Sequence, residues 1–157
     1  YMLDRVDFPL TTSQISEFIL DKGYTTYFRL QSALAELTDS GLLKIELTHN
    51  RTLYNLTEEG AATINYFRNK FSPEIRQEID NFINEKKYDL KEEVSVKSDY
   101  YLNTNHEYEV KCQILENGSH LIDMTLTVPT QTEAEAIVNN WNRKNQEIYA
   151  LLLSQLL

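Results

Sequence analysis

The chain has 157 residues, 41% of them hydrophobic, with only 4 Gly and 3 Pro, which is enough apolar material for one domain or two small ones. Its aliphatic runs are far shorter than the ~20 residues of a spanning helix, so we expect no membrane partner. The single cysteine, Cys112, excludes an internal disulfide and a multi-thiolate metal site and favours the reducing cytoplasm.

The net charge is −9, which argues against a protein that binds nucleic acid over its whole surface. The acidic excess lies mainly in the second half. Residues 1–70 carry seven Lys and Arg against nine Asp and Glu, whereas residues 71–157 carry eight against fifteen. Any contact with nucleic acid is therefore expected in the first 70 residues.

The first elements read as helical. Tyr1-Met2-Leu3 is typical of the end of a helix, and whether residues precede Tyr1 stays open. Ser13 is the expected N-cap of a short helix that ends at Gly23. The apolar residues after Ser13 recur at helical spacing: Ile15, Phe18 and Ile19.

A second helix and a hairpin follow. Thr25 or Thr26 is expected to cap a helix from Thr26 to Ser40, which Gly41 ends. Its buried face carries Leu30, Ala33, Leu34 and Leu37. The apolar period then changes to two over residues 43–47 and 54–56, which predicts a β-hairpin with a polar tip at residues 48–52.

Thr57 is the expected cap of a third helix, with Glu58 and Glu59 in the first turn, where the helix dipole favours anions. Its buried stripe would carry Ala61, Ile64 and Phe67. Two helices, a hairpin and a third helix follow one another in about 60 residues, which is the element order of a winged helix.

Two segments strengthen this pattern: Gly41-Leu42-Leu43, and Tyr54-Asn55-Leu56-Thr57-Glu58-Glu59-Gly60. With the element order, they resemble the winged helix-turn-helix of bacterial transcriptional regulators over the first 70 residues. The whole chain is most similar to a small uncharacterised bacterial family that joins a winged helix to a compact α/β tail. This resemblance implies fold more than function, since some winged helices bind DNA and others contact only proteins.

The second half begins with Ser72-Pro73, which opens a helix expected to end near Lys86-Lys87. The apolar face of this helix carries Ile75, Ile79, Phe82 and Ile83. Three strands in series are then predicted, around Val94 and Val96, over residues 108–114 and over residues 122–128. They suggest an antiparallel meander.

The turn between the last two strands contains Asn117-Gly118. A two-residue turn there would place the apolar residues of the two strands on opposite faces. A three-residue loop with Gly118 in the left-handed conformation keeps them together, and we expect it. It pairs Ile114 with His120, Cys112 with Ile122 and Val110 with Met124.

Pro129 ends the last strand, and Thr130 with Glu133 forms a predicted capping box for a helix that reaches Leu157. Its apolar stripe is longer than a three-stranded sheet covers. We therefore expect a homodimer, with packing on the chain's own first domain as the alternative. The expected dimer contacts are Ile148, Leu152, Leu153 and Leu156.

The predicted fold class is α+β, with a winged helix-turn-helix over residues 1–70 and an α-β-β-β-α domain over residues 71–157. The function expected is that of a cytoplasmic transcriptional regulator that binds double-stranded DNA as a homodimer. Arg29 would read guanine, Gln31 adenine, and Ser32 a base or a phosphate. The full set of expected DNA contacts is Thr25, Thr26, Arg29, Gln31, Ser32, Lys44, His49, Asn50 and Arg51. The competing class is a protein-interaction module that does not bind DNA.

The sequence offers little for catalysis. Its histidines, His49, His106 and His120, are far apart and form no ligand pair, and neither a phosphate loop nor a nucleophile elbow occurs. We expect no enzyme activity, no metal and no cofactor, with Cys112 as a small buried hydrophobe. An unidentified small-molecule effector could contact an aromatic set in the second domain, although core packing is the favoured role of these residues. The set is Tyr100, Tyr101, Leu102, Tyr108 and Trp141.

Overall fold

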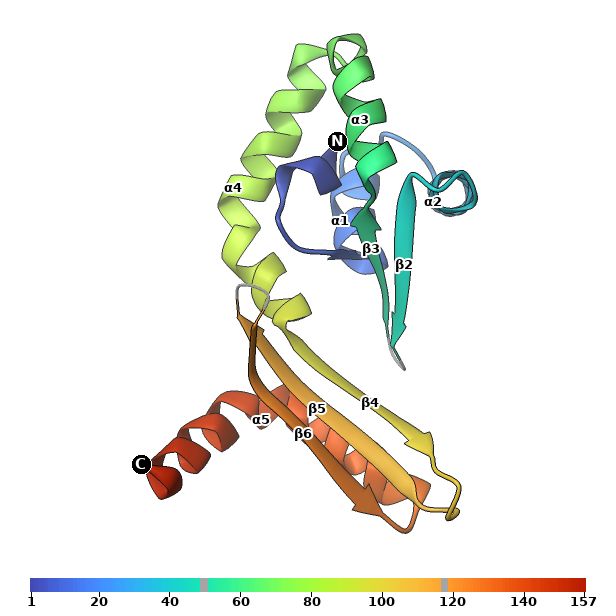
Figure 1. Cartoon of the computed structure of the whole chain (residues 1–157). Coiled ribbons are helices and arrows are strands. Elements are labelled where there is room, and N and C mark those ends of the chain that lie inside the picture. Colours follow the sequence, from blue (N-terminus) through green and yellow to red (C-terminus); the bar gives the residue numbers. More distant parts are fainter. Residues whose placement is uncertain (49–50, 117–118) are drawn as a thin grey trace. The chain divides into compact units, whose positions relative to one another are not determined.

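The computed structural model describes residues 1–48, 51–116 and 119–157, which form a mixed α+β fold with two antiparallel sheets of three strands each (Figure 1). The chain divides into two compact units, Tyr1–Leu47 with Arg51–Val94, and Ser95–Leu157 with Thr48. The division lies after Val94 and not after residue 70, because the helix that begins at Pro73 packs into the core of the first unit.

The first unit contains η1 (Met2–Arg5), β1 (Leu10–Thr11), α1 (Thr12–Asp21), α2 (Tyr27–Asp39), β2 (Leu43–Thr48), β3 (Arg51–Leu56), α3 (Glu58–Phe67), η2 (Arg68–Lys70) and α4 (Pro73–Ser95). The expected order of helices and hairpin strands is confirmed. The hairpin tip, His49 and Asn50, lies outside the described residues. The opening Tyr1-Met2-Leu3 is part of a short 3₁₀ helix with Tyr1 as its N-cap.

The start of α1 differs from the prediction. Its N-cap is Thr11 and not Ser13, because Gln14 supplies the reciprocal half of a capping box: Thr11 Oγ1 accepts from the Gln14 amide at 3.1 Å, and Gln14 Oε1 accepts from the Thr11 amide at 2.9 Å. Strand β1, which the sequence did not predict, ends at this cap. It pairs antiparallel with β3, so the sheet order is β1-β3-β2.

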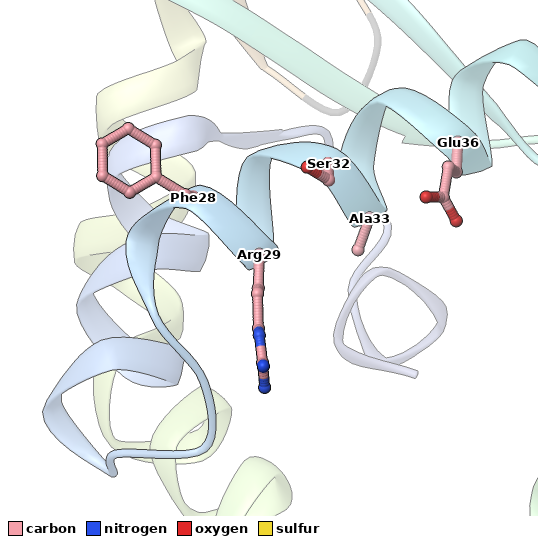
Figure 2. A pocket seen from close by; sticks show the side chains of 5 residues that line it. All are labelled: Phe28, Arg29, Ser32, Ala33 and Glu36. Atoms are coloured by element: carbon pink, nitrogen blue, oxygen red, sulfur yellow. The ribbon is translucent and has the colours of Figure 1, made fainter.

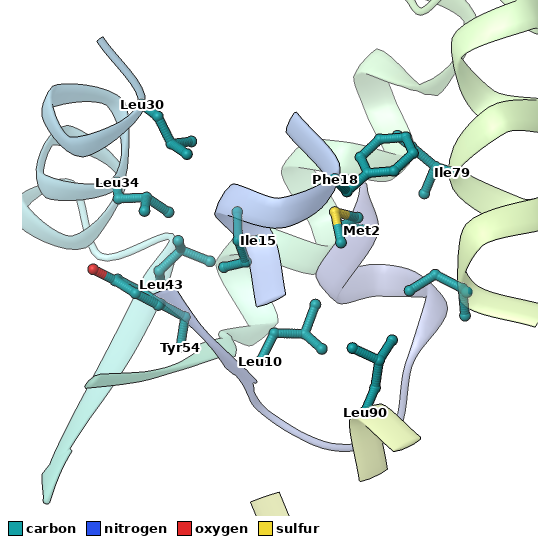
Figure 3. Close-up of a cluster of buried hydrophobic side chains, with 11 residues drawn as sticks. Met2, Leu10, Ile15, Phe18, Leu30, Leu34, Leu43, Tyr54, Ile79 and Leu90 are labelled. Carbon is teal, nitrogen blue, oxygen red and sulfur yellow. The ribbon is translucent and has the colours of Figure 1, made fainter. Parts of the chain in front are cut away.

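A hydrophobic core holds the first unit together (Figure 3). Leu10 of β1 is fully buried in it, and Phe18 of α1, 2% exposed, belongs to the same cluster. Leu30 and Leu34 attach α2 to this core, as the helical spacing predicted. Ile79 brings α4 into the same cluster, which is why that helix belongs to the first unit.

Helix α4 is longer than predicted. It continues past Lys86-Lys87 to Ser95, so the expectation of a strand at Val94 is wrong. Leu90 is 3% exposed and lies in the same cluster as Ile79 and Ile83, so the buried helical face simply continues. Tertiary packing outweighs the strand preference of the β-branched Val94.

The second unit contains β4 (Val96–Leu102), β5 (Tyr108–Glu116), β6 (Ser119–Val128) and α5 (Gln131–Leu156). The antiparallel meander is confirmed, in the order β4-β5-β6. So is the capping box at the start of α5, with Thr130 as N-cap and Glu133 reaching back to it. The buried cluster joins Val110 and Cys112 of β5 to Ala134, Val138 and Trp141 of α5.

The predicted register between β5 and β6 is wrong by two residues. Cys112 faces Met124 and not Ile122, and Ile114 faces Ile122 and not His120. The register shifts between Ile114 and Leu115, so that Leu121 has no residue opposite it. This bulge keeps the apolar residues of both strands on one face. We had expected a three-residue turn to have this effect. The turn residues Asn117 and Gly118 lie outside the described residues.

Candidate nucleic-acid interface

The outer face of α2 is the centre of the candidate site. Leu30 and Leu34 bury the inner face, and the opposite face carries a shallow groove along the helix surface. Figure 2 shows its side chains, which all come from this one helix: Phe28, Arg29, Ser32, Ala33 and Glu36. Phe28 is 81% exposed and Arg29 also faces solvent. Polar side chains of α2 therefore lie at the surface, as contacts with DNA bases would require.

The expected contacts on α2 and its cap are only partly brought to this surface. Thr26, Arg29 and Ser32 are exposed, whereas Thr25 is half-buried. Thr26 is the N-cap of α2 but its side chain makes no capping hydrogen bond. Gln31 is half-buried, and its Nε2 is buried without a hydrogen-bond partner among the described residues. It is thus less available to a base than its neighbours.

The hairpin contributes one exposed cation and one cation that is hydrogen-bonded to α4. Lys44 on β2 is exposed. Arg51 on β3 is half-buried, and its Nη1 donates a hydrogen bond of 2.6 Å to the carbonyl oxygen of Glu93 in α4. The guanidinium that we expected at a DNA phosphate therefore already has a partner inside the first unit. His49 and Asn50 lie outside the described residues.

The charge on α2 is mixed. Arg29 is its one cation, and Glu36 lies in the same groove (Figure 2), while Asp39 is the last residue of the helix. A duplex on this face would meet both signs of charge. One copy of the chain would accordingly gain only modest affinity from phosphate contacts on this face.

Of the expected dimer contacts on α5, one is half-buried and three are exposed. Ile148 is half-buried against the core of the second unit. Leu152, Leu153 and Leu156 are exposed, Leu156 by 78%. Beyond Ile148, the described part of α5 thus carries an apolar surface that its own unit does not cover.

The five residues proposed for an effector are not brought together. Tyr100 and Tyr108 lie with ring centroids 6.0 Å apart and, like Trp141, pack in the second core. Tyr101 and Leu102 are more than half exposed. Tyr101 donates to Glu109 at 2.6 Å, which raises the pKa of the phenol and lowers that of the carboxyl. The structure thus uses part of this set as core.

The residues with catalytic potential are dispersed. Cys112 is fully buried in the second core, and burial raises the pKa of its thiol to about 11. Within the described ranges, no group of three or more His, Cys, Asp and Glu lies close enough together to hold a metal ion. His106 and His120 are both exposed, and His120 Nδ1 lies 3.2 Å from Asp123.

A cavity of about 660 Å³, partly open to solvent, lies in the first unit. Its wall includes Leu30, Leu34 and Leu37 of α2 and Ile64 of α3. The described residues that line it carry no charged side chain, and Tyr24 and Thr63 are among its few polar ones. The hydroxyl of Tyr24 donates to Glu78, which raises the pKa of the phenol and lowers that of the carboxyl. The cavity therefore offers apolar packing rather than acid–base chemistry.

One important residue was missed by the sequence analysis. Gln14 is 2% exposed and links α1 to the last turns of α4: its Nε2 donates to the Leu90 carbonyl at 3.1 Å and to the Glu93 carboxylate at 2.8 Å. The signal was present, since Thr11 and Gln14 have capping-box spacing. The nearby Ser13 was chosen as the cap instead.

These observations define a mixed α+β protein with two antiparallel sheets and an exposed helix beside a hairpin. The family model described as "Domain of unknown function (DUF4364)" matches residues 1–156, so the chain belongs to this family. Neither the curated proteins nor the solved structures contain a match. In the described part of the chain, no helix is long and apolar enough to cross a membrane.

Proposed function

We propose that the first unit is a winged helix-turn-helix that binds double-stranded DNA, and that the chain is a transcriptional regulator acting as a homodimer in the cytoplasm. The observation that carries this proposal is the arrangement of α2. Leu30 and Leu34 hold its inner face, while Arg29 and Ser32 stand exposed on the outer one. The hairpin β2-β3 follows it directly, and β1 pairs with β3. This is the order in which winged helices present a reading helix and a wing.

The roles follow from position. Arg29 is the base-reading residue and Ser32 a base or phosphate contact, while Lys44 supplies charge from the hairpin. Gln31 has a lesser part, since its amide nitrogen is buried. Because one copy offers few cations, a second copy is needed to double the number of phosphate contacts.

Arg29→Ala is expected to weaken binding to a cognate duplex about tenfold, since a bidentate contact from Arg to guanine contributes roughly 1–3 kcal/mol of discrimination. Fluorescence anisotropy over a series of salt concentrations measures this change. The logarithm of the wild-type affinity should fall steeply with the logarithm of the salt concentration, as counterion release requires.

Arg143→Ala is the matched control, because it removes the same charge from an exposed position of α5 in the second unit. Its affinity should remain within about twofold of wild type. Equal losses in the two variants would mean that only net charge matters. Binding that is weak and indifferent to salt would favour the interaction module.

The proposed dimer places the exposed leucines of α5 against a second copy. Leu152→Glu with Leu156→Glu should then give a folded monomer of 18.4 kDa in sedimentation, where the wild type has twice that mass. Ser154→Glu with Gln155→Glu adds the same charge to the same exposed helical segment and should stay dimeric. An unchanged mass in the leucine variant would remove the dimer from the proposal.

The protein-interaction module is the second candidate, and Phe28 favours it. Its ring is 81% exposed on the outer face of α2, in the groove that Glu36 also lines. Exposed aromatic residues are typical anchors of protein interfaces, and a carboxylate in the same groove repels phosphate. The salt series described above separates the two candidates.

A further inference from the structure

The junction between the two units contains no loop. Helix α4 ends at Ser95 and strand β4 begins at Val96. Among the described residues, Gln14 and Arg51, which belong to other elements of the first unit, bind the last turns of α4. Gln14 of α1 binds the Leu90 carbonyl and the Glu93 carboxylate, and Arg51 of β3 binds the Glu93 carbonyl at 2.6 Å.

The bond from Arg51 is a helix C-cap supplied from the hairpin. Glu93 is among the last four residues of α4, whose carbonyl groups have no amide of the same helix to bind. A guanidinium satisfies such a carbonyl and also places positive charge at the negative end of the helix dipole. The order of the last turn therefore depends on a cation that belongs to the hairpin.

The two anchors differ in accessibility. Gln14 is buried, and its bond to the Leu90 carbonyl is buried as well. The bond between Arg51 and Glu93 is exposed to solvent. A phosphate group carries a full negative charge, and two of its oxygens accept parallel bonds from a guanidinium, so it competes with the neutral carbonyl of Glu93 for Arg51. Arg51 can thus be withdrawn from α4 by an anion, whereas Gln14 cannot.

We propose that Arg51 is a switch residue: in the free protein it caps α4, and on DNA it transfers to a phosphate and releases the last turn of the helix. Occupation of the hairpin is thereby transmitted to the α4–β4 junction. This inference rests on the proposed function, since the anion that it names is a phosphate of the DNA backbone.

The cap is tested in the free protein by amide hydrogen exchange at Val94 and Ser95. Arg51→Ala is expected to speed exchange there about tenfold, as loss of a charge-assisted hydrogen bond implies. Arg51→Gln, which keeps much of the side-chain length, should act in the same direction. Arg29→Ala, which removes a cation from α2, should leave these amides unchanged. Unchanged exchange in both Arg51 variants overturns the proposal.

The transfer is tested by adding a mixed-sequence DNA duplex at low salt, with binding followed by anisotropy in the same samples. DNA should speed exchange at Val94 and Ser95 in the wild type about tenfold and have no further effect in Arg51→Ala. Binding without this acceleration overturns the switch and leaves the proposed function standing. Absence of any binding overturns both.

Discussion

Gln14→Ala is expected to lower the free energy of unfolding by about 3 kcal/mol, because it removes three side-chain hydrogen bonds, one of them to a carboxylate, from a buried site. The substitution leaves the Thr11 amide without its capping partner, and Thr11 is itself buried. It also detaches the last turns of α4 from α1. Urea denaturation followed by circular dichroism measures the change.

Glu93→Ala is the matched comparison. It removes only the carboxylate that accepts from Gln14 and leaves the other two bonds of that amide in place. Because Glu93 is exposed, the loss should be no more than about 1 kcal/mol. If the two variants lose equal stability, the buried contacts of Gln14 to Thr11 and Leu90 contribute nothing and the anchoring role is wrong.

The prediction from sequence succeeded where a single periodicity covered a whole element. The alternation in β5 and β6 and the capping box at Thr130 needed no knowledge of the rest of the molecule. Strand β1 could not be found in this way, since its two residues are too few to alternate. Leu10 and Thr11 are recognisable as a strand only through their pairing with β3.

Two errors have a common physical origin. At Val94 and Val96 an apolar alternation and a continuing helix were both consistent with the sequence, and the contacts of Leu90 with the first core decided in favour of the helix. In the β5–β6 pair the apolar faces can be matched by the turn or by a bulge, and the structure uses a bulge at Leu121. In both cases the local sequence pattern was compatible with two structures, and packing against another element determined which of them forms.

In the candidate interface, too, some features could be predicted from local sequence and others could not. The outward direction of Arg29 and Ser32 follows from helical spacing once Leu30 and Leu34 face inward, so the sequence could predict it. The partner of Arg51 could not be predicted, because Glu93 lies 42 residues further along the chain. The same holds for Gln14, whose contacts with Leu90 and Glu93 require α1 and α4 to pack together.

The start of α3 is packed closely against the segment that follows α2, and Thr57 makes this contact. Thr57 caps α3 by accepting from the Gly60 amide at 3.0 Å. Its hydroxyl also lies within hydrogen-bonding distance of the carbonyl oxygens of Gly41 and Leu42, at 2.8 and 3.0 Å. The segment that ends α2 is thereby bound closely against the first turn of α3, which leaves little space at Gly60.

Gly60→Ala is therefore expected to destabilise the protein by about 2 kcal/mol, although the same change at an open helical site stabilises by up to about 1 kcal/mol. An added Cβ would overlap the backbone carbonyl oxygen of Leu42 and lie 2.7 Å from Leu56 Cδ1. The Leu42 carbonyl cannot retreat cheaply, since it accepts from the amide of Thr57 at 3.2 Å.

Chemical denaturation of Gly60→Ala and of Ala62→Gly distinguishes steric contact from helix propensity. Ala62 is exposed in the same helix, so its change to glycine should cost only about 0.5–1 kcal/mol. If propensity governed both sites, Gly60→Ala would stabilise and Ala62→Gly would destabilise by similar amounts. Steric contact at Leu42 instead makes both variants less stable than the wild type, with Gly60→Ala the more severely affected, because the end of α2 and the start of α3 must then move apart.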